Sequence, residues 1–154
     1  MNRREMLLKS SLLAGGFCTC SNIFGKDDPR SNCCFTPEIE PECLAFRDGK
    51  AIIDLDRTHT INEPGYAAFI IDEEKGIDII LVHADEGEFY ALQRLCTHGG
   101  RSISYIHERG KLQCNNYNHS TFDLSGEVFK GPAPRSLVSY PVELNMNQLE
   151  ISVS

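Results

Sequence analysis

Two short segments of this chain each carry a cysteine and a histidine at close spacing. The first reads CTHGG, in which one residue separates Cys96 from His98. The second reads CNNYNHS, in which four residues separate Cys114 from His119, and fifteen residues lie between His98 and Cys114. Thiolates and imidazoles that converge from two loops can bind a metal centre. The pattern therefore predicts either a tetrahedral zinc ion or a [2Fe–2S] cluster with both thiolates on one iron and both imidazoles on the other.

The residues around these segments favour the cluster over zinc. Gly99 and Gly100 end the first segment and allow a tight turn whose N–H groups can approach an inorganic sulfide. Ser120 and Thr121 follow His119 and offer hydroxyl donors to sulfur. Further along, the sequence GPAP at residues 131–134 is stiff and has few N–H groups, so it is suited to covering a cofactor.

These motifs resemble the Rieske iron–sulfur family, and the resemblance spans the chain from about residue 51 to the C-terminus. It implies an all-β fold: a Rieske-like antiparallel β-sandwich with a cluster-binding subdomain of two loops plus a Pro loop. It implies one [2Fe–2S] cluster per chain, one-electron transfer as the activity, and no catalytic residue. The metal and cofactor ligands that the resemblance implies are Cys96, His98, Cys114 and His119.

The second loop departs from the family pattern. The family usually places its histidine three residues after the cysteine, where this chain has Tyr117. We therefore expect a loop that is one residue longer and still delivers an imidazole, from His119. In that alignment Thr121, in place of Ser120, would take the role of the family's serine.

A second departure concerns a disulfide. Rieske proteins of cytochrome bc complexes carry an extra cysteine in each loop, and the matching positions here are Arg101 and Asn116, so no disulfide is expected to brace the cluster. With two neutral imidazoles the oxidised cluster has no net charge, so its potential lies at about −150 to +300 mV, against roughly −400 mV for all-thiolate plant-type clusters. We expect the lower or middle part of that range.

Composition limits the partners. The chain has 154 residues, 41% of them hydrophobic, which predicts one domain plus a short extra segment. Its formal net charge of −7 argues against nucleic acid or an anionic lipid surface as the main partner and leaves a basic redox partner open.

The first 25 residues resemble a twin-arginine export signal. Arg3 and Arg4 precede Met6, Leu7 and a modest apolar stretch from about residue 10 to 24. That stretch falls short of the about 20 predominantly apolar residues of a membrane-spanning helix, although an uncleaved anchor stays open. An ordinary basic amphipathic start is the alternative. Export would place the protein in the periplasm or on the outer face of the cytoplasmic membrane.

The remaining chain divides into a linker at 26–50 and a Rieske domain at 51–154, whose cluster-binding part covers about 93–134. In an oxidising compartment, we expect Cys43 to pair with Cys33 or Cys34 in the linker.

Short β-rich runs predict antiparallel hairpins throughout the domain. The runs are 51–55, 66–71, 77–82, 88–92, 127–129, 137–144 and 148–153. Outside the motifs, His59, His83 and His107 are expected to be surface histidines.

Three functions follow from these observations. The leading one is a small exported electron carrier, or the electron-transfer subunit of a membrane or periplasmic oxidoreductase, rather than a catalyst on its own. Its redox partner would be a cytochrome b or c or a molybdopterin oxidoreductase subunit, with membrane association through the N-terminal segment. The second is a Rieske ferredoxin component of an oxygenase system, which should be cytoplasmic and lack a leader. The third is a structural zinc module.

Overall fold

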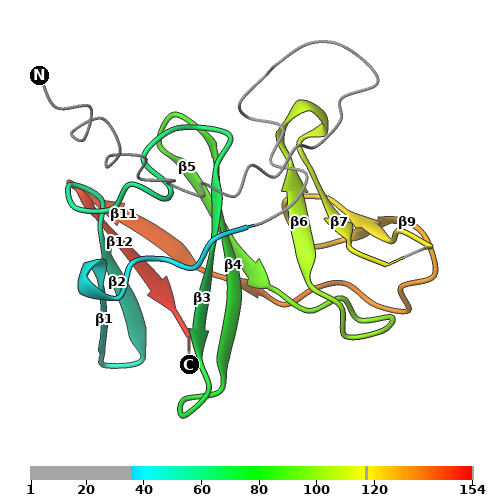
Figure 1. The fold of residues 1–154 in the computed structure, drawn as a ribbon, viewed down its shortest axis with the longest axis horizontal. Helices are drawn as coiled ribbons and strands as arrows, with labels where there is room; N and C mark the ends of the chain where they lie inside the picture. The colour runs from blue at the N-terminus through cyan, green and yellow to red at the C-terminus, as the bar shows by residue number, and fades with distance from the viewer. Residues whose placement is uncertain (1–35, 117, 154) are drawn as a thin grey trace, which may run out of the picture.

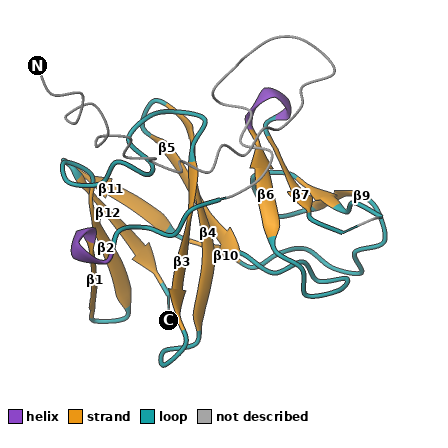
Figure 2. Ribbon diagram, in the orientation of Figure 1, coloured by secondary structure: helices purple, strands orange, loops and turns teal. Residues whose placement is uncertain are grey.

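The computed structural model of the protein describes residues 36–116 and 118–153, which form three antiparallel sheets (Figures 1 and 2). Two short 3₁₀ helices, η1 (Pro41–Cys43) and η2 (His107–Arg109), are the helical elements of these residues. The strands are β1 (Leu44–Arg47), β2 (Lys50–Asp54), β3 (Ala67–Asp72), β4 (Ile77–Asp85), β5 (Glu88–Gln93), β6 (Ile103–Ile106), β7 (Lys111–Cys114), β8 (Thr121–Phe122), β9 (Val128–Lys130), β10 (Ser139–Tyr140), β11 (Val142–Asn145) and β12 (Gln148–Ser152). The predicted all-β class is confirmed.

Two of the sheets form the sandwich. The first has the strand order β1-β2-β12-β11, and the second, called here the middle sheet, has the order β10-β5-β4-β3. Along β2 and β12 every second residue is buried, as expected for strands with one face on a core. The inward side chains of both sheets form one core, which includes Ala51, Ile53, Ala68, Ile70, Ile79, Leu81, Ala91, Leu149 and Ile151.

The third sheet, β6-β7-β8-β9, lies against the other face of the middle sheet and forms the right-hand end of the molecule in Figure 1. A second core joins the two sheets. From the middle sheet it takes Ile80, Val82 and Leu92, and from the third sheet and its loops it takes Cys96, Ile103, Leu112, Cys114, Phe122, Ala133 and Leu137. Strand β4 therefore faces a core on both sides. This explains why its residues from Ile79 to His83 are all buried, without the alternation of a half-exposed strand.

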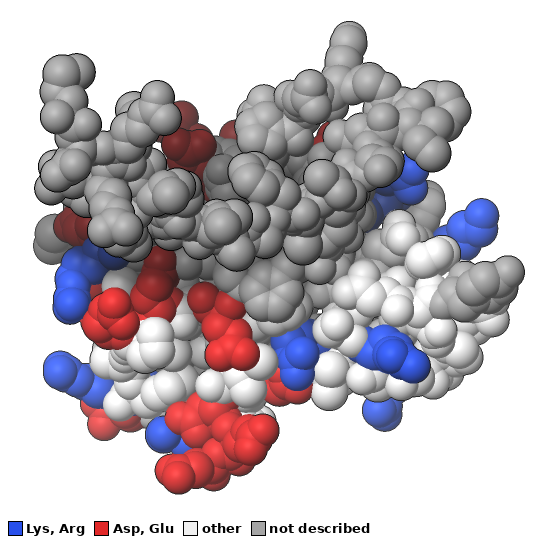
Figure 3. Space-filling model, in the orientation of Figure 1, with Lys and Arg blue, Asp and Glu red and all other residues white. Residues whose placement is uncertain are grey.

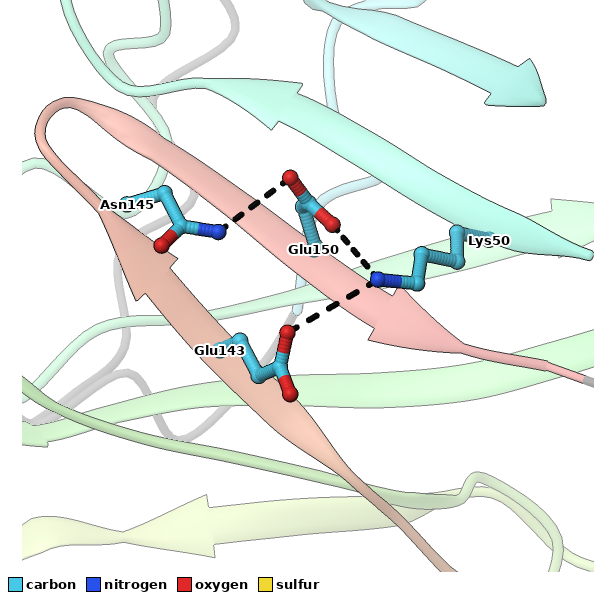
Figure 4. A network of polar contacts seen from close by, with 4 residues as sticks. All are labelled: Lys50, Glu143, Asn145 and Glu150. Atoms are coloured by element: carbon cyan, nitrogen blue, oxygen red, sulfur yellow. Dashed lines mark hydrogen bonds and ion pairs between the residues drawn. The ribbon is translucent and has the colours of Figure 1, made fainter. Parts of the chain in front are cut away.

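Polar side chains bridge the outer face of the first sheet. Lys50 Nζ lies 2.7 Å from Glu150 Oε2 and 3.7 Å from Glu143 Oε2, and Asn145 Nδ2 donates to Glu150 Oε1 at 3.2 Å (Figure 4). The network crosses from β2 through β12 to β11. Ion pairs with this much exposure contribute about 0–1 kcal/mol each, so the strand register depends mainly on the core.

Part of the segment that was expected to be a linker is built into the fold. The N–H of Ile39 donates to the carbonyl of Phe69 at 2.9 Å, and the Ile39 side chain is buried. Glu40 accepts hydrogen bonds from the Thr58 hydroxyl at 2.5 Å and the His59 N–H at 3.0 Å. Burial opposes ionisation of Glu40, but these hydrogen bonds outweigh it and lower its pKa to about 2. Residues 36–50 thus contribute η1, β1 and the start of β2.

Most predicted runs coincide with observed strands, with two kinds of difference. The run 137–144 is divided into β10 and β11 at Pro141, which has no N–H to donate. The prediction did not include β1, β6, β7 and β8.

The expectation that His83 lies at the surface is wrong. His83 is 7% exposed, because both faces of β4 are covered. Its Nδ1 lies 2.9 Å from the carbonyl oxygen of Ile61, and its ring stacks on Phe89 with a centroid distance of 4.1 Å.

The predicted disulfide and leader fall largely outside the described residues. The structure does not describe residues 1–25, Cys33 or Cys34. Cys43 is a buried free thiol, and its pKa is raised first by burial and then by the charge of Glu40. Within residues 36–116 and 118–153, no helix has the length and apolar character needed to cross a membrane.

The two cores can be tested with a matched pair of substitutions. Ile79 and Ile80 are adjacent in β4, both are fully buried, and they face opposite cores. Ile79→Ala and Ile80→Ala should each lower the free energy of unfolding by about 2–5 kcal/mol, measured by urea denaturation. Only Ile80→Ala opens a cavity in the core that holds Cys96 and Cys114. Only this variant should therefore speed the loss of visible absorbance from the expected cluster, and equal loss in both would contradict the two-core architecture.

Candidate cluster-binding site

Backbone hydrogen bonds close both cysteine loops at one end of the third sheet. In the first loop the Cys96 N–H donates to the carbonyl of Arg101 at 2.8 Å, and the Gly100 N–H donates back to the Cys96 carbonyl at 2.9 Å. In the second loop the Cys114 N–H donates to the carbonyl of Ser120 at 2.8 Å. Each cysteine therefore sits at the base of a loop that its own main chain closes.

The two loops are also joined to each other. The Asn115 N–H donates to the carbonyl of Ser102 at 3.0 Å, and the Asn115 side chain exchanges hydrogen bonds of 3.0 and 3.1 Å with Ser104. A Cβ atom on Gly99 would lie 3.5 Å from Asn116 Nδ2, so the loop tips are close as well. These contacts fix the position of one loop relative to the other.

The two thiols are buried beside each other. Cys96 is 2% exposed and Cys114 is 1% exposed. Burial, followed by the hydrogen bond with the Cys96 thiol, raises the pKa of Cys114 to about 11, and the positive charge of Arg101 acts in the opposite direction. Two thiolates in such a place need a positive centre to be stable, and a soft metal centre supplies one. The cysteine pair thus fits an iron–sulfur centre.

The two histidines lie on the same loops but are exposed. His119 has φ of +33°, and its Nδ1 lies 3.2 Å from the Cys114 carbonyl oxygen and 3.2 Å from Gln113 Nε2. Within the described residues, no three Cys, His, Asp or Glu side chains form a group that could hold a metal ion. The structure therefore brings the two cysteines together and does not bring His98 and His119 up to them. Their assignment as ligands stays a prediction, and Tyr117 lies outside the described residues.

The Pro loop, residues 131–134, lies directly on the second cysteine loop. Ser120 is 2% exposed, and its hydroxyl accepts a hydrogen bond from the Ala133 N–H at 3.1 Å. Gly131 has φ of +110°, and a Cβ atom there would lie 2.6 Å from the Ser120 Cα. Only glycine allows this approach without a backbone shift. The covering role that the sequence predicted for this loop agrees with its position.

Thr121 does not take the place expected for it. It lines a pocket on the outer face of the third sheet together with Gln113, and its Oγ1 is buried without a hydrogen-bond partner among the described residues. Because neighbouring strand residues point to opposite faces, Thr121 and Ser120 diverge at the start of β8. Ser120 is thus the hydroxyl that lies between the second loop and the Pro loop.

Sequence reasoning missed Gln113 and the influence of Arg101. Gln113 immediately precedes Cys114 in β7, points to the opposite face of the strand, and contacts His119. Gln113 could have been found from the alternation of polar and apolar residues along Lys111–Cys114, a strand that the sequence analysis did not assign. Arg101 was treated only as the residue at a missing disulfide position.

Comparison with known proteins decides the family. The model of the Rieske [2Fe-2S] domain matches residues 57–141, which is more than half of the chain. The chain belongs to the Rieske family. This Rieske protein binds a [2Fe–2S] cluster and is an electron carrier. Of the two metal centres that the sequence allowed, the family match therefore selects the cluster and not a zinc ion.

Two curated relatives come from different redox systems. The chain is 35% identical over 79 residues to the 3-phenylpropionate/cinnamic acid dioxygenase ferredoxin subunit of Photorhabdus laumondii, a match covering 50% of this chain and 74% of the relative. It is 37% identical over 65 residues to the cytochrome b6-f complex iron-sulfur subunit 2 of Cyanophora paradoxa, covering 41% of this chain but only 27% of the relative.

A solved structure agrees with the fold. The ferredoxin of carbazole 1,9a-dioxygenase from Nocardioides aromaticivorans IC177 superposes with a TM-score of 0.55 at 19% identity, covering 67% of this chain and 95% of that one. At this identity the likeness speaks for the fold alone. It supports the predicted antiparallel Rieske sandwich with a cluster-binding subdomain.

The contact between the Pro loop and the second cysteine loop can be tested at Gly131. Gly131→Ala should lower the free energy of unfolding by about 2–4 kcal/mol, because the new Cβ meets the Ser120 backbone and φ is positive. Gly76→Ala is the matched control: φ is +68° there, but nothing lies within 4 Å, so about 1 kcal/mol is expected. Thermal unfolding and cluster retention measure both effects. Similar losses in the two variants would mean that the loop contact is not tight.

Proposed function

We propose that this Rieske protein is an exported one-electron carrier whose cluster is held by Cys96, His98, Cys114 and His119. The observation that carries the proposal is the pair of buried thiols that belong to one core cluster at the loop end of the third sheet. When bound, the cluster accepts and releases one electron. The histidines are taken as ligands because they share the two cysteine loops and because the family uses two imidazoles on one iron.

The surrounding residues keep the loops in one geometry. Asn115 ties the second loop to Ser102 and Ser104, and Ser120 ties it to the Pro loop. Loops held in this way change little when one electron is added or removed, which favours fast transfer. The exposure of His98 and His119 supports a surface location for the electron's exit, where a partner can approach them.

The export proposal is supported by the sequence. The Arg3-Arg4 pair and the following apolar stretch have the order of a twin-arginine signal, and this route carries folded proteins with their cofactors inserted. An exported carrier would take electrons from, or pass them to, a membrane or periplasmic oxidoreductase. The absence of cysteines at positions 101 and 116 supports a potential in the lower or middle part of the Rieske range.

A second candidate function is the ferredoxin component of an oxygenase system. The match to a dioxygenase ferredoxin subunit, over 74% of that protein, is the observation that favours it. The two functions differ in compartment. A cytoplasmic protein that restores turnover to a purified oxygenase and its reductase would support the ferredoxin function.

The ligand assignment predicts opposite results for two substitutions in the second loop. His119→Ala should lose the visible absorbance of the cluster, together with two irons and two acid-labile sulfides per chain. Tyr117→Phe, at the position where the family usually has its ligand, should keep all three. Iron and sulfide analysis of both variants, made alongside the unaltered protein, gives the answer. Retention of the cluster in His119→Ala would show that another residue completes the site.

The export proposal predicts the fate of an arginine-to-lysine change. Arg3→Lys combined with Arg4→Lys keeps the charge but removes the guanidinium pair, so the protein should stay in the cytoplasm. Arg30→Lys, outside the predicted leader, is the control and should be exported normally. Immunoblots of periplasmic and cytoplasmic fractions measure the outcome. Periplasmic recovery that is equal in both variants would exclude the twin-arginine route.

A further inference from the structure

Charge is divided unevenly between the two ends of the fold. Residues 94–135, which comprise the third sheet and its loops, contain six Lys or Arg and three Asp or Glu. The other described residues, 36–93 and 136–153, contain four Lys or Arg and sixteen Asp or Glu. On the face drawn in Figure 3, acidic side chains gather over the sandwich, and basic side chains are spread over the end that holds the third sheet. We call residues 94–135 the basic end.

Within residues 36–116 and 118–153, most cations of the basic end form no ion pair. In the sandwich, Lys50 and Lys75 are each paired with a carboxylate on the same sheet or turn. Arg94 of the basic end pairs with Asp78. Among the described residues, the following cations of the basic end form no ion pair: Arg101, Arg109, Lys111, Lys130 and Arg135.

A pocket of about 370 Å³ lies among these cations, on the outer face of the third sheet. Arg109, Lys111 and Lys130 line it, together with the ring of Phe129, which is 64% exposed. Lys111 Nζ lies over that ring, 2.8 Å from its centroid. Thr121 also belongs to this lining, although its Oγ1 is buried. The pocket thus combines positive charge with an aromatic face.

The pocket adjoins the proposed site of electron exit. Gln113 lines it, and Gln113 Nε2 lies 3.2 Å from Nδ1 of His119. The other two cations of this group, Arg101 and Arg135, lie beside the first cysteine loop. Arg101 closes that loop through its carbonyl, and the carbonyl of Arg135 accepts a hydrogen bond from the Thr97 hydroxyl at 2.7 Å. Cations that form no ion pair with another described residue therefore flank both histidine-bearing loops.

We propose that the basic end is the docking surface for an acidic redox partner protein, and that a carboxylate of the partner occupies the pocket between Lys111 and Lys130. This inference rests on the proposed function as an electron carrier. It names the charge of the partner face, which the net charge of −7 does not reveal. The Debye length is about 8 Å at physiological ionic strength, so a partner at this surface interacts mainly with the local cations. The acidic sandwich repels the same partner elsewhere and orients it toward His119.

The shape of the pocket favours a protein over a lipid surface. A concave site with an exposed aromatic ring suits a protruding side chain with apolar neighbours, because aromatic residues are enriched in protein interfaces. A flat anionic bilayer would also meet two exposed carboxylates of this end, Glu108 in η2 and Glu127 between β8 and β9. An anionic membrane is therefore the alternative that the experiment must exclude.

The first experiment tests the charge around the site of electron exit by comparing the rates at which an anionic and a cationic oxidant take the electron. Holoprotein with an intact visible spectrum is reduced, and its oxidation by ferricyanide, an anion, and by tris(phenanthroline)cobalt(III), a cation, is followed by stopped flow over a range of salt. In the unaltered protein the ferricyanide rate should fall as salt rises. The Lys111→Glu and Lys130→Glu double variant should lower the low-salt ferricyanide rate about tenfold and raise the cobalt rate. Lys111→Gln with Lys130→Gln, which perturbs the strands less, should give a smaller change in the same directions.

A matched control separates local from total charge. Arg47 and Arg57 are exposed cations of the sandwich end, and Arg47→Glu with Arg57→Glu changes the net charge as much as the lysine pair does. This variant should leave both rates nearly unchanged. Equal effects of the two double variants, or a ferricyanide rate that rises with salt in the unaltered protein, would overturn the proposal.

The second experiment tests the class of partner and does not require electron transfer. A hexaglutamate peptide, used as an acidic protein surface, should shift the backbone amide resonances of Lys111, Phe129 and Lys130, and the shifts should vanish in the lysine-to-glutamate variant. Phosphatidylglycerol vesicles should not bind. Vesicle binding through the same lysines without an effect of hexaglutamate would overturn the proposal in favour of a membrane. If the protein binds the peptide but carries no cluster, the proposed electron transfer is wrong and the acidic docking surface is still supported.

Discussion

The burial of Cys96 and Cys114 side by side constrains both cysteine loops and the packing of the third sheet against the middle sheet. The two residues belong to separate loops, and each is placed by main-chain hydrogen bonds rather than by a flexible side chain: Cys96 through Arg101 and Gly100, and Cys114 through its pairing with Ile103 in the register of β6 and β7. Because the thiols are also part of the second core, the site cannot loosen without disturbing the packing between the middle and third sheets.

The middle sheet packs against both the first sheet and the third sheet and so connects the sandwich to the cysteine loops. Its two faces contribute to different cores, so the sandwich supports the third sheet and the third sheet supports the cysteine loops. The Pro loop completes the arrangement from the other side, where Gly131 allows the backbone to approach Ser120. A rigid support of this kind suits a centre that must gain and lose an electron with little rearrangement, whereas the exposed His98 and His119 are left accessible to a partner.

The sequence was most informative where a local rule dominates. Short β-rich runs between turns that contain Gly and Glu predicted the sandwich strands, and the two Cys-His segments predicted the loops. It failed where tertiary contacts decide. Strands β6 and β7 were hidden because their polar outward residues, such as Gln113, face a pocket that no sequence period reveals. His83 was placed at the surface because nothing local shows that both faces of β4 are covered, and β1 lies in a Pro- and Glu-containing stretch that reads as a linker.

Net charge is the clearest case of a global quantity that misleads about a local one. A charge of −7 left a basic partner as the open alternative, yet the acidic residues belong mainly to the sandwich, and the third sheet carries an excess of cations. The difference has a physical origin in the fold. Strands β7 and β9 place Lys111 and Lys130 on the outer face of a sheet whose inner face must be apolar to bury the cysteines, so the cations can only point outward, beside His119. The constraint that buries the sulfurs therefore also determines which face can carry the charge that a partner meets first.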